Sequence, residues 1–97
     1  MTHLIARSDV DEFDEWKASF DEFTEARVDH GCTRFTVLRG VDDPDHVTVV
    51  MEFDTEADAR SWADYVDEDA QAAAGMHETD LTVFEVAEDW AGARATT

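Results

Sequence analysis

Hydrophobic side chains recur along the chain with two different periods, and these periods divide it into strands and helices. Residues 2–8 hold a short apolar run that predicts a first strand. Over residues 9–30, four aromatic side chains recur at steps of three, four and three, which places them on one stripe of a helix: Phe13, Trp16, Phe20 and Phe23. We expect a single helix of about twenty residues, capped by Asp9 or Asp11 and ended by Gly31.

The next two segments alternate between apolar and polar residues with a period of two. Residues 32–40 and 46–53 are rich in β-forming side chains, so each predicts a strand. The intervening residues 41–45 contain Pro44, which cannot continue either strand. The three segments together predict an antiparallel hairpin.

A second helical period begins after the hairpin. Thr55 is in position to cap this helix, and its apolar stripe consists of Ala59, Trp62, Ala63 and Val66. Residues 67–76 predict a further short helical piece, and residues 80–88 predict a last strand.

The resulting order is β-α-β-β-α-β, which is the order of the ferredoxin-like unit. Right-handed crossovers then place both helices on one face of a four-stranded antiparallel sheet, so the class is α+β. With 97 residues the chain has room for one domain. We assign it to residues 1–90, with residues 91–97 as a C-terminal tail.

Charge is the most unusual feature of the composition. The 25 acidic residues outnumber the 7 basic ones, Lys17 is the single lysine, and the formal net charge is −18. Such charge repels itself and destabilises the compact state, whereas salt near 1 M shortens the screening length to about 3 Å. The composition resembles that of salt-in halophiles such as haloarchaea. Nucleic acids and anionic membranes are excluded as partners, because both require a basic patch.

The cysteine, the histidines and the absence of known motifs exclude several classes of site. Cys32 is the only cysteine, so no intramolecular disulfide forms, and we expect a reducing, cytoplasmic location. No apolar run approaches the length of about twenty residues that a membrane span needs. The four histidines are scattered without metal-ligand spacing, and no phosphate-binding loop is present. We therefore expect neither a metal nor a cofactor.

Two kinds of side chain deserve to be weighed as candidate site residues. Glu52 lies between apolar neighbours in a strand, where it is either the salt-bridge partner of Arg34 or Arg39 or a buried carboxylate fit for proton transfer. Trp16 and Trp62 lie on apolar helical stripes. Each is either a core residue or part of an aromatic platform for a flat ligand.

The strand–helix junction over residues 49–63 has the sequence VVMEFDTEADARSWA. In this junction, in its length and in its topology, the chain resembles the dimeric α/β-barrel superfamily and, within it, the antibiotic biosynthesis monooxygenase-like domains. The resemblance implies a barrel-like dimer that oxidises polycyclic aromatic molecules without a cofactor, or degrades haem. It also implies an Asn on the first strand and a Trp on the second helix, which Trp62 matches. The chain contains no Asn, and His77 lies beyond Gly75, so we do not expect haem degradation.

The first hypothesis for function is therefore a monooxygenase-like domain that binds or oxidises a small, flat, apolar molecule. Its site would be the helix–sheet cleft, lined by Trp16, Trp62 and Phe53, with His3 or Glu52 as the catalytic polar group. The alternative is a non-catalytic homodimeric interaction domain that has lost the active site of the family. In both cases we expect a homodimer joined through the sheet, because the strands carry apolar residues on both faces.

Overall fold

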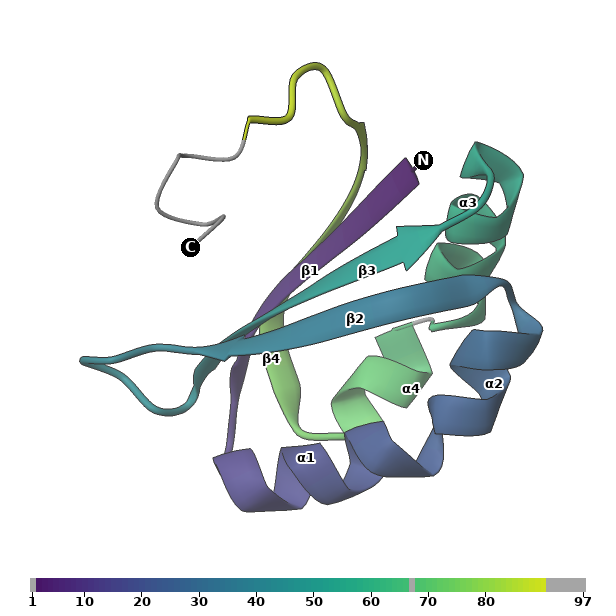
Figure 1. Cartoon of the computed structure of the whole chain (residues 1–97). Helices are drawn as coiled ribbons and strands as arrows, with labels where there is room; N and C mark the ends of the chain where they lie inside the picture. The colour runs from purple at the N-terminus through teal and green to yellow at the C-terminus, as the bar shows by residue number, and fades with distance from the viewer. Residues whose placement is uncertain (1, 67, 91–97) are drawn as a thin grey trace.

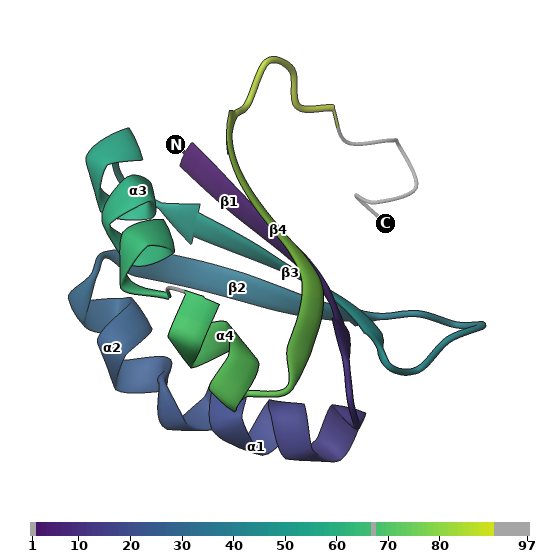
Figure 2. The same cartoon turned by 180° about the vertical axis from the view of Figure 1, so that it is seen from behind.

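The computed structural model describes residues 2–66 and 68–90 of the chain. One antiparallel sheet has the strand order β2-β3-β1-β4. The strands are β1 (Thr2–Val10), β2 (Cys32–Arg39), β3 (His46–Phe53) and β4 (Met76–Glu85). The helices α1 (Phe13–Glu22), α2 (Thr24–Asp29), α3 (Glu56–Tyr65) and α4 (Glu68–Ala73) all lie on one face of the sheet (Figures 1 and 2). The predicted ferredoxin-like α+β fold is confirmed.

The central strand β3 shows which side of the sheet faces the helices. Val47, Val49, Met51 and Phe53 are buried, and they belong to the core that also contains Leu4 of β1 and Trp16 and Trp62 of the helices. The alternate residues of β3 point to the other face, which no helix of the described chain covers (Figure 2). That open face carries apolar side chains from all four strands, among them Ile5, Leu38, Val50 and Phe84.

The first helical segment differs from its prediction, because it is broken into α1 and α2 at Phe23. Phe23 donates its backbone N–H to the carbonyl of Phe20, three residues back, and the Thr24 hydroxyl donates to the carbonyl of Asp21. Arg27 Nη2 also donates to the carbonyl of Phe20, at 2.9 Å. These side-chain and short-range bonds replace the regular hydrogen bonds of the helix, and the aromatic stripe changes direction there.

The predicted ends of two strands and of one helix were also wrong. β1 continues to Val10, so the cap of α1 is Glu12, whose carboxylate accepts from the backbone N–H of Glu15, rather than Asp9 or Asp11. β4 begins at Met76, four residues earlier than expected, and ends at Glu85. Its early start follows from the antiparallel pairing of Met76 with Val10. The tail predicted over residues 91–97 lies outside the described residues.

The second crossover, which joins β3 to β4, follows its prediction closely. Thr55 caps α3 by accepting a hydrogen bond from the backbone N–H of Asp58. Gly31, with φ of +95°, ends the first crossover directly beside this cap, and a Cβ there would lie 2.6 Å from Asp58 Oδ2. The close approach fixes the end of α2 against the start of α3. No helix in the described part of the chain is long and apolar enough to cross a membrane.

Candidate functional site

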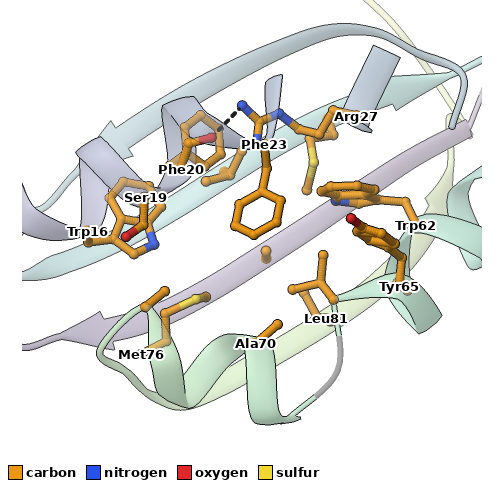
Figure 3. Close-up of a pocket in the computed structure, with 16 residues that line it drawn as sticks. Trp16, Ser19, Phe20, Phe23, Arg27, Trp62, Tyr65, Ala70, Met76 and Leu81 are labelled. Carbon is orange, nitrogen blue, oxygen red and sulfur yellow. Dashed lines mark hydrogen bonds between the residues drawn. The ribbon is translucent and has the colours of Figure 1, made fainter. Parts of the chain in front are cut away.

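A cavity lies between the sheet and the helices, and Figure 3 shows the side chains around it. The cavity has a volume of about 80 Å³ and opens to solvent. The sheet contributes Ala6, Val49, Met51, Met76 and Leu81 to its wall, and the helices contribute aromatic residues. A concave, mostly apolar space of this kind is the usual setting for a small-molecule site.

Aromatic rings from both crossovers form the helical side of the cavity. Trp62 and Tyr65 of α3 stack with 5.1 Å between ring centroids and 17° between planes. Trp16 of α1 packs against Phe20 with centroids 5.0 Å apart, on the other side of the space (Figure 3). Phe23, at the break between α1 and α2, meets Tyr65 edge to face. Phe23 and Tyr65 are 38% and 44% exposed, so they stand at the mouth.

Besides the indole N–H groups of Trp16 and Trp62, three side chains bring polar atoms to this apolar wall. Ser19 and Tyr65 each contribute a hydroxyl, and Arg27 contributes a guanidinium that is 2% exposed. The Arg27 guanidinium lies over the Phe20 ring, with Cζ 3.7 Å from the ring centroid. Neither carboxylate nor imidazole is present among the described lining residues, so no base of these two kinds faces the cavity.

The structure separates the residues that the sequence grouped into one site. Trp16 and Trp62 line the cavity, as the platform hypothesis requires, whereas Phe53 is fully buried in the core beside it. His3 and Glu52 are paired across β1 and β3 on the open face of the sheet, with His3 Nε2 3.6 Å from Glu52 Oε1. They therefore point away from the cavity, on the opposite side of the sheet.

Glu52 has the salt-bridge partner that one of its two interpretations required. Arg34 Nε lies 3.5 Å from Glu52 Oε2, and the two residues are paired between β2 and β3. Arg39, the other candidate, instead donates from Nε to the carbonyl of Pro44 and covers the ring of Phe13. The arrangement makes Glu52 part of a polar cluster on the open face.

Cys32 is buried at the start of β2 and donates a hydrogen bond from Sγ to the carbonyl of Arg34, at 3.4 Å. Burial raises the pKa of the Cys32 thiol, and the neighbouring Arg27 charge only partly offsets this effect. Among the described residues, no three His, Cys, Asp or Glu side chains gather as a set of metal ligands. Cys32 is thus a protonated core residue rather than a nucleophile or a ligand.

Sequence reasoning missed Arg27 and Tyr65 as cavity residues, although a signal for each was present. Arg27 follows Phe23 by four residues and so extends the stripe of Phe13, Trp16, Phe20 and Phe23 by one more helical step. Tyr65 follows Trp62 by three residues, at the edge of the second stripe. A charged residue at an apolar stripe position is the informative exception, because buried charges are rare.

A ferredoxin-like sheet with an aromatic, almost entirely apolar cavity under its helices defines an α+β domain with a candidate small-molecule site. The family model described as antibiotic biosynthesis monooxygenase matches residues 1–75. The chain belongs to the antibiotic biosynthesis monooxygenase family. No curated protein matches it.

Solved structures of other proteins share the fold of this chain. SnoaB, a cofactor-independent oxygenase from Streptomyces nogalater, superposes with a TM-score of 0.72 at 15% identity, over 91% of this chain and 94% of its own. A proposed antibiotic biosynthesis monooxygenase from Nitrosomonas europaea gives 0.69 at 20% identity, over 91% and 100%. A variant of MhuD with two manganese protoporphyrin IX molecules bound per active site gives 0.69 at 22% identity, over 95% and 100%.

Proposed function

We propose that this chain binds a small, flat, apolar molecule in the cavity between its sheet and helices, and that it oxidises this molecule with O₂. The observation that carries the proposal is the stacked pair of Trp62 and Tyr65, which faces an unfilled apolar space across from Trp16 (Figure 3). An aromatic ligand inserted there buries apolar area against rings that already lie in order. Family membership supports the oxidation step.

The composition of the wall limits how such an oxidation proceeds. The described lining residues supply no carboxylate or imidazole as a base at the cavity. The substrate must then be electron-rich as it binds, so that it acts as the reductant of O₂ itself. His3 and Glu52, on the far face of the sheet, take no part in this chemistry.

Calorimetry with the neutral probe 2-naphthamide, in about 2 M KCl, tests the binding half of the proposal. We expect saturable binding that Trp62→Ala weakens about tenfold or more, because the stacking face and its buried area are both lost. Trp90→Phe is the matched control, since Trp90 is 80% exposed and does not line the cavity. An absence of binding, or equal losses in both variants, contradicts the proposal. Oxygen consumption with a panel of electron-rich polycyclic phenols then tests the oxidation.

We further propose that the chain is a homodimer joined through the open face of the sheet. Leu38 and Phe84 on that face are 50% and 46% exposed, and Ile5 and Val50 lie between them on the central strands. Apolar residues grouped on an uncovered sheet face favour an interface, and a two-fold axis lets one face serve both subunits.

Light scattering behind a sizing column in about 2 M KCl measures the oligomeric state, and twice the chain mass of 10.9 kDa is expected. Phe84→Arg should give a monomer, because it places an unpaired charge within the proposed interface. Val41→Arg is the control, because Val41 is 97% exposed in the hairpin loop between β2 and β3. A wild-type monomer at micromolar concentrations overturns the proposal.

A further inference from the structure

Arg27 is the one charged side chain that is buried within the described part of the chain. It comes from α2 and lies at the boundary of the cavity, beside Phe20 and Phe23 (Figure 3). Burial lowers the pKa of the guanidinium from its usual value, and electrostatic interactions with the Cys32 and Asp21 side chains only partly oppose this effect. An Arg nevertheless stays protonated in proteins, so a positive charge faces an apolar space.

This buried charge has no counterion of its own. None of the ion pairs among the described residues includes Arg27, although the chain carries 25 acidic residues. Asp21 acts on Arg27 only from beyond ion-pair distance, and its carboxylate is already bound to Lys17 Nζ at 2.6 Å. A buried cation without a partner is energetically unfavourable, so a compensating anion is to be expected nearby.

The hydrogen bonds of Arg27 also leave part of its guanidinium without a partner. Nη2 donates to the carbonyl of Phe20 at 2.9 Å and to the hydroxyl of Thr24 at 3.1 Å. Nε is buried and has no acceptor among the described residues. The two bonds from Nη2 explain how Arg27 holds the break between α1 and α2. They do not explain the unpaired Nε–H of a residue that lines the cavity, because most buried donors in folded proteins are satisfied.

We propose that the natural ligand of the cavity is an anion: a flat, apolar molecule with a carboxylate, phenolate or enolate oxygen that pairs with Arg27. The inference rests on the proposed function, and the oxygen of the ligand is the acceptor that Arg27 lacks. The ring system of the ligand occupies the aromatic space between Trp16 and Trp62, and its oxyanion reaches the guanidinium. A conjugate base of this kind is also the electron-rich form that oxidation without a protein base requires.

The test compares two ligands of one shape, 2-naphthoate and 2-naphthamide, by calorimetry in about 2 M KCl. Hydrogen bonds to charged groups contribute about 1.5–3 kcal/mol, so we expect wild type to bind the carboxylate about ten- to hundredfold more tightly than the amide. Arg27→Met should abolish this preference and leave the amide affinity within about threefold. Arg27→Lys, which keeps the charge, should retain part of the preference.

Arg60→Met is the matched control, because it removes one exposed positive charge that is paired with Glu56 rather than with the cavity. It should keep the full preference. Equal affinities of wild type for the two ligands, or a preference that survives in Arg27→Met, overturn the anion inference while the proposed function stands. If neither ligand binds, the proposed function fails and the inference fails with it. Comparison of the wild-type affinities decides the question even where a variant does not fold.

Discussion

Replacing Arg27 by Met should stabilise the free protein, even though it should destroy the recognition of anions. Met has a similar length and an apolar, flexible side chain, so it fills the same space on the cavity wall. The substitution removes a 2%-exposed charge that has no ion-pair partner among the described residues. Replacing buried charged groups by apolar ones of similar volume has stabilised other proteins by about 1–4 kcal/mol.

The surroundings of Arg27 indicate where in that range the gain should fall. Its two acceptors keep other hydrogen bonds in the variant, since the carbonyl of Phe20 also accepts from the N–H of Phe23, and Thr24 still donates to the carbonyl of Asp21. No buried acceptor is therefore orphaned. Two charged hydrogen bonds and the contact with the Phe20 ring are lost, which offsets part of the gain. We expect a net stabilisation of about 1–2 kcal/mol.

Urea unfolding in about 2 M KCl, followed by circular dichroism, measures this change, and the salt suppresses the extra repulsion from losing one positive charge. A gain of 1 kcal/mol corresponds to a rise in Tm of about 4–8 °C for a domain of this size. Arg60→Met, at an exposed ion pair, should change the stability by less than about 1 kcal/mol. A loss of more than 1 kcal/mol in Arg27→Met would show that the guanidinium is needed for folding, and the reasoning would be refuted.

Three further predictions concern salt, the thiol and haem. Thermal melts in 0.1 M and about 2 M KCl should differ, with the higher midpoint at high salt because the net charge of −18 is screened; coincident midpoints contradict this. Iodoacetamide should modify Cys32 far more slowly in the folded chain than in urea, because burial raises the pKa of the thiol above its ordinary value of 9.0. Stability should fall as the pH rises above that value, since the unfolded chain loses this proton first; a flat profile for wild type relative to Cys32→Ala argues against it. Haem should not be degraded, because the described cavity wall holds no histidine to ligate the iron, and reductant-dependent bleaching of a Soret band with a ring-opened product would overturn this.

The fold was accessible from the sequence because the hydrophobic period of each element is clear. The alternation of β3 predicted its two faces, and the Thr55 cap predicted the start of α3. The break at Phe23 was not accessible, because the helical period does not show that the Thr24 hydroxyl and Arg27 Nη2 donate to backbone carbonyls there. The early start of β4 depends on pairing with Val10, sixty-six residues away from Met76 along the chain.

Only the aromatic part of the candidate site could be predicted from the sequence. Helical spacing placed Trp16 and Trp62 on stripes that face the sheet, and the structure brings both to one cavity. His3 and Glu52 were grouped with them because period two shows that Val50 and Glu52 share a face but does not show which face the helices cover. Only the burial of Val49, Met51 and Phe53 reveals that Glu52 points the other way.

The opposite signs of the acidic surface and the buried Arg27 have a consequence for the kinetics of ligand entry. An anion that approaches this chain meets a repulsive field from a net charge of −18 before it reaches the positive charge inside. Added salt shortens the range of the outer repulsion, but it does not penetrate the dry contact between Arg27 and an oxyanion. Salt should therefore speed association while it leaves dissociation almost unchanged, which is the reverse of the usual dependence for charged partners. At low ionic strength the same cavity would fill slowly, so ambient ionic strength sets the rate at which this protein samples its ligand.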